Sequence, residues 1–107
     1  MFDLSTIEWR ATGHEGIFLS VLRRDERTGD ATVFIKMEQG RGYPAHRHKG
    51  PEEVLVLQCG YRDRWGEHRA GDYLVNEPDS THHPVALEGP DPCVLLAIAH
   101  GGIEIKK

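Results

Sequence analysis

The stretch that decides the fold is residues 40–60, GRGYPAHRHKGPEEVLVLQCG. It places His46 and His48 two residues apart, and Glu52 follows after a Lys-Gly-Pro turn. Side chains two residues apart on a strand point to the same face, so both imidazoles can reach one point, and the turn can bring the carboxylate there. Imidazoles with one carboxylate suit zinc, iron, nickel, copper or manganese, whereas calcium prefers oxygen ligands. This stretch therefore predicts a transition-metal site.

The rest of the chain is typical of short strands separated by turn residues. No segment longer than ten residues has a 3.6-residue apolar period. Alternation over residues 31–38 predicts that Val33, Ile35 and Met37 face a core, and a hairpin turn is expected at 65–67. The expected strands are 17–22, 31–38, 54–57, 61–64, 68–69, 71–75, 93–99 and 103–105, and a loop at 78–81 leads to residues 82–85. This pattern predicts an all-β barrel or sandwich.

A second segment, residues 71–84 (GDYLVNEPDSTHHP), offers another imidazole at His82. An expected strand and a tight loop precede this histidine. In a closed barrel a strand distant in sequence can line the same interior. His82 is therefore a candidate fourth ligand beside His46, His48 and Glu52.

The two segments resemble the two motifs of the cupin superfamily, G-x5-H-x-H-x3/4-E-x6-G and G-x5-P-x-G-x2-H. Gly40, His46 and His48 match the first motif directly. Counting from Gly71 selects His82, although Glu77 and Asp79 stand where the second motif has proline and glycine. Counting instead from Pro78, one position late, would select His83.

Most of the chain, from about residue 9 to residue 98, resembles more narrowly the cupin domain of ChrR-like anti-sigma factors. In that group the carboxylate ligand lies four residues after the second histidine, which is Glu52 here. Cys59 then replaces the usual glycine. If Gly60 were the motif glycine, the ligand would be Glu53 instead. The resemblance implies a single-domain cupin over residues 1–107, a double-stranded β-helix (jelly-roll barrel) with its core at about 9–100.

The remaining histidines and the tyrosines match neither motif. We expect His14, His68 and His100 to be surface or ordinary polar residues, and His83 to be the best spare candidate for supporting a ligand. Tyr43, Tyr61 and Tyr73 could line a pocket mouth, but core or rim packing is the favoured interpretation.

The resemblance implies one divalent transition metal per chain: zinc, iron, nickel or manganese. Three histidines and one glutamate would fill a tetrahedral zinc site, whereas a six-coordinate metal keeps two positions for a small-molecule ligand in the barrel. We expect a ligand-sensing or regulatory protein of the ChrR-like type. The alternatives are a metal-dependent dioxygenase, or an isomerase, acting on a small chelating substrate such as a diketone or phenol, and a purely structural metal.

Charge and composition limit the partners. The net charge is −4, and acidic residues interleave with Arg23, Arg24 and Arg27, so nucleic-acid binding is not expected. No apolar run approaches the roughly 20 residues of a membrane span, and no signal peptide is recognisable, so a cytoplasmic protein with reduced, buried Cys59 and Cys93 is expected.

Two further expectations concern assembly. ChrR-like anti-sigma factors carry an additional N-terminal helical domain that grips the sigma factor, and this chain begins almost directly with the barrel. Sigma-factor binding is therefore not expected. A homodimer is expected, because small barrels leave open sheet edges, and the apolar strand 17–22 is the suggested edge.

Overall fold

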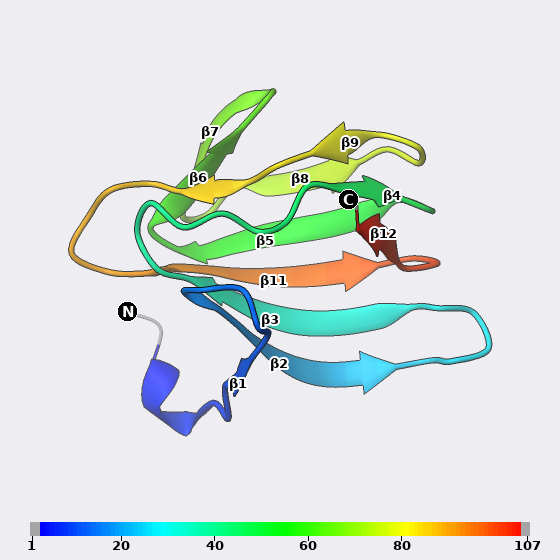
Figure 1. Ribbon diagram of the computed structural model, residues 1–107, viewed down its shortest axis with the longest axis horizontal. Helices are drawn as coiled ribbons and strands as arrows, with labels where there is room; N and C mark the ends of the chain where they lie inside the picture. The colour runs from blue at the N-terminus through cyan, green and yellow to red at the C-terminus, as the bar shows by residue number, and fades with distance from the viewer. Residues whose placement is uncertain (1–2, 106–107) are drawn as a thin grey trace.

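The computed structural model describes residues 3–105, and it consists almost entirely of short antiparallel strands (Figure 1). A single 3-10 turn, Leu4–Thr6, precedes them. The strands are β1 (Arg10–Ala11), β2 (Ile17–Arg24), β3 (Ala31–Met37), β4 (His46–His48), β5 (Glu52–Gln58), β6 (Gly60–Asp63), β7 (Gly66–Arg69), β8 (Tyr73–Asn76), β9 (Thr81–His82), β10 (Val85–Ala86), β11 (Cys93–Ala99) and β12 (Ile103–Ile105). The expected all-β class is confirmed.

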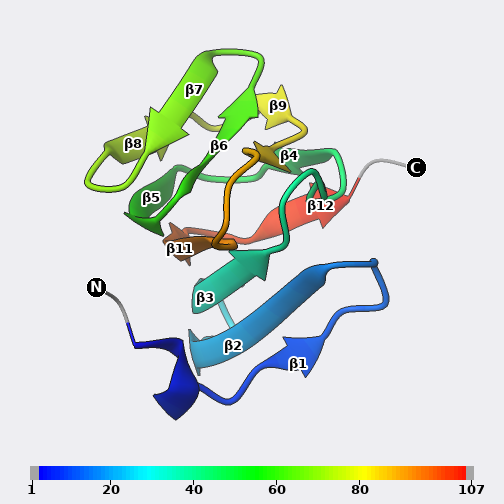
Figure 2. The same ribbon diagram turned by 90° about the vertical axis from the view of Figure 1, so that its left-hand side faces the viewer.

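One large sheet forms a wall of the barrel, and two small sheets close the opposite side (Figure 2). The large sheet has the order β1-β2-β3-β11-β5-β8, and the small sheets have the orders β10-β6-β7 and β12-β4-β9. Neighbouring strands in the large sheet are far apart in sequence: β11 lies between β3 and β5. This crossing brings the two halves of the chain around one interior.

The interior is filled by the alternate side chains of the large sheet. On β5, Val54 and Val56 are buried, while Leu55 and Leu57 between them are only partly buried. Met37 is fully buried on β3, and Val33 and Ile35 pack against the same core, as the alternation predicts. Burying these aliphatic side chains stabilises the fold by roughly 1.5–3 kcal/mol for each one fully removed from water.

The expectation that strand 17–22 forms a sheet edge is wrong in one respect. The two-residue strand β1 lies outside it and pairs with Phe18 and Leu19. The half of β2 beyond this pairing keeps its apolar side chains exposed, with Val21 and Leu22 at 43% and 52%. The opposite edge of the large sheet is β8.

No helix within residues 3–105 is long and apolar enough to cross a lipid bilayer. Cys93 is fully buried and Cys59 partly buried, and both are free thiols. Burial raises the pKa of the Cys93 thiol to about 12, because the charged thiolate would lose its hydration.

Candidate metal centre

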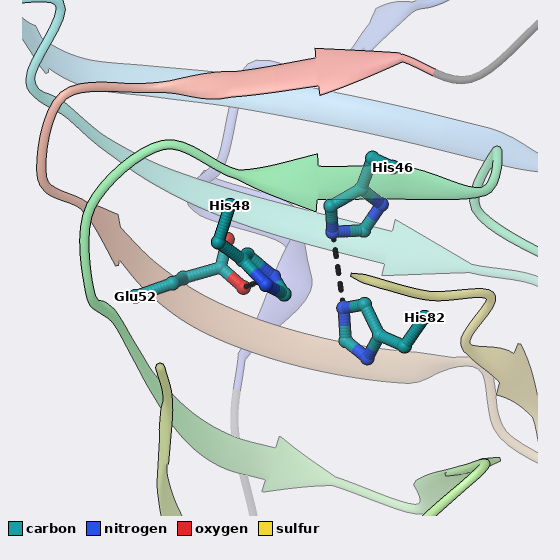
Figure 3. Close-up of side chains that lie close together, drawn as sticks. All are labelled: His46, His48, Glu52 and His82. Carbon is teal, nitrogen blue, oxygen red and sulfur yellow. Dashed lines mark hydrogen bonds and ion pairs between the residues drawn. The ribbon is translucent and has the colours of Figure 1, made fainter. Parts of the chain in front are cut away.

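The four expected ligands come together at one point inside the barrel (Figure 3). His46 and His48 stand on β4, Glu52 opens β5, and His82 ends β9. The ladder between β4 and β9 pairs His46 directly with His82. Each of the four residues offers one ligand atom, and these atoms lie within 4.8 Å of one another. All four side chains are buried, so the cluster is part of the interior.

In two of these histidines the ring nitrogen that faces away from the cluster, Nδ1, lies within hydrogen-bond distance of a group that can only accept a hydrogen bond. His46 Nδ1 lies 2.8 Å from the Pro44 carbonyl oxygen. His82 Nδ1 lies 2.9 Å from Asp63 Oδ2. Each Nδ1 therefore carries the proton and donates it, so each Nε2 keeps a free lone pair directed at the cluster.

His48 is held in the same tautomer by Ser80. Its Nδ1 lies 3.0 Å from the Ser80 carbonyl oxygen and 2.9 Å from Ser80 Oγ. The Ser80 hydroxyl donates its own proton to the Glu77 carbonyl, so its oxygen acts as an acceptor toward His48. Nδ1 of His48 is consequently the protonated nitrogen, and all three Nε2 atoms are free to bind a cation.

The inner contacts show why a cation fits here. Nε2 of His46 lies 3.0 Å from Nε2 of His82, and Nε2 of His48 lies 3.1 Å from Glu52 Oε1. With every Nδ1 donating outward, both contacts bring two lone pairs together, which is unfavourable unless a positive charge lies between them. Three neutral imidazoles and one carboxylate are a donor set that divalent transition metals bind.

The protonation states suit metal binding at neutral pH. Burial lowers the pKa of His46 to about 4, since the charged imidazolium loses hydration, and burial lowers the pKa of His82 for the same reason. Burial opposes ionisation of Glu52, whereas the hydrogen bond that Asn76 Nδ2 donates to Glu52 Oε1 at 3.1 Å favours it, and the pKa of Glu52 lies below its ordinary value. At neutral pH the cluster would therefore offer a metal ion the neutral imidazoles of His46 and His82 and the ionised carboxylate of Glu52.

Backbone conformation supports one of the two possible registers in each motif. Cys59 and Asp79 are the non-glycine residues in the described chain with positive φ, at 58° and 67°. Glycine adopts this left-handed region without a steric penalty, so the positive φ at both positions supports the register in which they take the place of the motif glycines. Their registers select Glu52 and His82. Glu53 instead accepts hydrogen bonds from Tyr73 and His100, outside the cluster, and His83 is exposed.

Sequence reasoning missed the group that supports His82. Asp63 has a side chain only 1% exposed, and it bonds to His82 on one oxygen and to His68 Nε2 on the other, at 3.0 Å. Burial opposes its ionisation, but the bonds from His82 and His68 keep the pKa of Asp63 below its usual value. His68 is thus buried and not on the surface. His83, the histidine expected to support a ligand, is exposed, and the observed hydrogen bond to the outer nitrogen of His82 comes from Asp63. No motif spacing marks Asp63. The one sequence signal is that Asp63 follows Tyr61 by two residues on an expected strand, where both side chains point to the same face.

A cavity of about 220 Å³ lies beside the cluster, and we call it the barrel cavity. His46, Glu52 and His82 line one part of it, and aliphatic side chains of the large sheet line most of the remainder. Tyr43 and Tyr61 also line it, and Tyr61 packs in the core as expected. Tyr73 is exposed on β8, where its hydroxyl donates to Glu53. A ligand in this cavity could contact a metal ion at the cluster.

Known proteins with this sequence pattern and fold include an anti-sigma factor. The chain is 33% identical over 96 residues to the anti-sigma-E factor ChrR of Cereibacter sphaeroides; the match covers 88% of this chain but 42% of that protein. The crystal structure of Rhodobacter sphaeroides SigE in complex with the anti-sigma ChrR superimposes with a TM-score of 0.79 at 30% identity, over 91% of this chain and 50% of that one.

A more distant solved structure shares the fold alone. It is an RmlC-like cupin protein from Ralstonia eutropha JMP134, with a TM-score of 0.84 at 21% identity, over 98% of this chain and 70% of the other. This chain therefore spans less than half of its curated relative, and the likeness concerns the barrel. The sequence model of the ChrR cupin-like domain matches residues 1–104, which include both histidine segments, and the protein therefore belongs to the ChrR cupin-like domain family.

Proposed function

We propose that this protein holds one divalent transition metal on His46, His48, Glu52 and His82, and uses it to sense a small ligand in a regulatory role. The observation that carries the proposal is the convergence of three free Nε2 lone pairs and one carboxylate at a buried point. When bound, the metal would supply a Lewis-acidic position for an oxygen or nitrogen donor.

The surroundings of the cluster favour a ligand-binding role over a purely structural one. A structural zinc site is normally closed by its protein ligands. Here His46, Glu52 and His82 also line the barrel cavity, so a molecule in the cavity would lie next to the metal. The regulatory part of the proposal rests on the relationship to an anti-sigma factor. That this chain itself does not bind a sigma factor stays a prediction.

Metal content tests the first part of the proposal. Untagged protein should contain about one zinc, iron, nickel or manganese ion per chain by elemental analysis, either as purified or after reconstitution. His82→Ala should lose the ion, whereas His83→Ala, its exposed neighbour, should keep it. A wild-type protein that cannot be loaded with any of the four metals would contradict the proposal.

A second candidate function is a metal-dependent dioxygenase, and the same cavity favours it. Four protein ligands on a six-coordinate metal such as iron(II) leave two positions, enough for a bidentate substrate or for dioxygen with a monodentate one. Within this chain the cavity lining would orient the substrate and keep bulk water away from it.

Oxygen consumption separates the two functions. Iron(II)-loaded protein is mixed with a β-diketone or a catechol in an oxygen electrode, with the His82→Ala variant as control. A sensor should bind such a molecule and shift its thermal midpoint without consuming oxygen. Substrate-dependent oxygen uptake that is lost in His82→Ala would assign the enzyme function instead.

A further inference from the structure

The barrel cavity has a polar part and an apolar part. Its metal-ligand part presents His46, Glu52 and His82, and its remaining wall is formed mainly by aliphatic side chains, among them Val33 and Leu95. A volume of about 220 Å³ corresponds to about seven water molecules at roughly 30 Å³ each. An occupant with roughly seven to ten non-hydrogen atoms would fill this space, which is below the size range of ordinary drug-like pockets.

Tyr61 supplies a polar group that nothing in the described chain satisfies. Its side chain is 1% exposed, yet its hydroxyl has no hydrogen-bond partner among residues 3–105. The buried histidines, Glu52 and Asn76 all have such partners. Within the described residues the fully shielded side-chain atom without a partner is Trp9 Nε1, so the Tyr61 oxygen keeps some accessible surface. A hydroxyl that lines a cavity and makes no hydrogen bond to the protein is free to donate one to a molecule in that cavity.

The location of Tyr61 says where that acceptor would lie. Tyr61 lines the barrel cavity together with Glu52. Burial raises the pKa of the phenol, and the negative charges of Asp63 and, to a smaller extent, Glu52 raise it further. The hydroxyl therefore stays protonated at neutral pH and can only gain from an acceptor in the cavity. That acceptor would belong to a molecule reaching toward the metal ligands.

We propose that the barrel cavity binds a compact molecule with an oxygen-chelating head and an apolar body, the head accepting a hydrogen bond from Tyr61. The head would lie at the metal-ligand part of the cavity, and the body would pack against the aliphatic wall. This inference rests on the metal-binding function proposed above. It adds the class of ligand and a residue that determines specificity.

A matched pair of probes tests the apolar body. Acetohydroxamate and benzohydroxamate carry the same chelating head and differ only in a methyl or a phenyl group. Each is titrated into cobalt(II)-loaded protein, followed by the visible absorption of the cobalt, and into aqueous cobalt(II) as reference. Benzohydroxamate should bind the protein about tenfold to a hundredfold tighter than acetohydroxamate, beyond any difference seen with aqueous cobalt, because its ring is buried.

The role of Tyr61 is tested with Tyr61→Phe against Tyr73→Phe, whose hydroxyl bonds Glu53 on the exposed β8. Tyr61→Phe should weaken benzohydroxamate binding about tenfold, while its metal content and ligand-free thermal midpoint stay at or above the wild-type values. Tyr73→Phe should bind like the wild type.

Each outcome decides one part of the inference. Equal affinity for the two hydroxamates would overturn the apolar body, and unchanged affinity in Tyr61→Phe would overturn the hydrogen bond. Both results presuppose a loaded site, so a protein that takes up neither cobalt nor zinc, iron, nickel or manganese would instead count against the metal-binding function itself.

Discussion

Replacing Asp63 with asparagine should weaken metal binding, although Asp63 is not a ligand. Its buried carboxylate accepts hydrogen bonds from His82 Nδ1 at 2.9 Å, from His68 Nε2 at 3.0 Å and from the Trp65 amide at 3.0 Å. The variant keeps the shape of the side chain and exchanges one oxygen for an NH2 group. The perturbation is therefore electronic and local.

The expected loss of metal affinity can be worked out from these hydrogen bonds. The remaining carbonyl oxygen is best used on the side of His68 and Trp65, where it keeps two bonds, so the new NH2 group meets His82 Nδ1. Two donors then face each other unless His82 moves its proton to Nε2, which removes the lone pair needed by the metal. A lost hydrogen bond to a charged group is worth about 1.5–3 kcal/mol, or roughly a tenfold to 150-fold loss of affinity. Losses of about 10–100-fold are typical for such supporting residues.

Competition titration of zinc against a chelating dye at neutral pH measures this change. Asp72→Asn is the matched control, because Asp72 is an exposed carboxylate that accepts from the Arg69 amide at 2.8 Å, away from the cluster. Asp63→Asn should lose at least about tenfold in affinity, and Asp72→Asn less than about threefold. Equal affinities in the two variants would refute the argument that Asp63 fixes the tautomer of His82.

Four other predictions follow from the geometry. In the same titration Glu52→Gln should weaken zinc binding strongly because the anionic ligand is lost, and Glu53→Gln should change it little; the reverse order would show the motif register to be wrong. Cys59→Gly should raise the unfolding free energy by about 1 kcal/mol by relieving positive φ, and an unchanged thermal midpoint would argue against strain there. Burial lowers the pKa of His46 from 6.5 to about 4, so between these pH values the unfolded chain binds more protons than the folded one. The unfolding free energy of the metal-free protein should therefore fall as the pH drops from 6.5 to about 4. An unfolding free energy, measured by urea denaturation, that stays constant over this interval would contradict the prediction. Light scattering should give a homodimer, about twice 12.1 kDa, and a mass near 12.1 kDa would exclude it.

Much of the fold could be predicted because local sequence patterns carry it. The apolar alternation around Met37 specifies which face of that strand is buried, and the structure buries that face. The continuous apolar run 54–57 predicts a strand but not the face, and the structure buries Val54 and Val56 while Leu55 and Leu57 are only partly buried. The expected hairpin at 65–67 is found between β6 and β7, because Gly66 tolerates its positive φ of 121° at the turn. The short strand β1 could not be predicted, since two residues carry no periodic signal.

The candidate metal ligands could also be predicted from their spacing in the sequence, but the groups that hydrogen-bond to them could not. His46 and His48 share a strand face by the two-residue period, so a pair of ligands follows from the sequence alone. The partners of their outer nitrogens, Pro44 and Ser80, form bonds that depend on the exact path of the backbone. Asp63 lies on another strand altogether, and its bond to His82 exists only because the barrel closes.

The sequence by itself determined an all-β chain, the apolar faces of its strands and the residue types of a metal site. Those features depend on neighbours along the chain, where side-chain period and turn chemistry act locally. Tertiary structure decided which histidine of the pair 82–83 and which glutamate of the pair 52–53 points inward. Adjacent strand residues face opposite sides, so that choice depends on the pairing of β4 with β9 and of β5 with β11, together with the left-handed residues Cys59 and Asp79 that set the register.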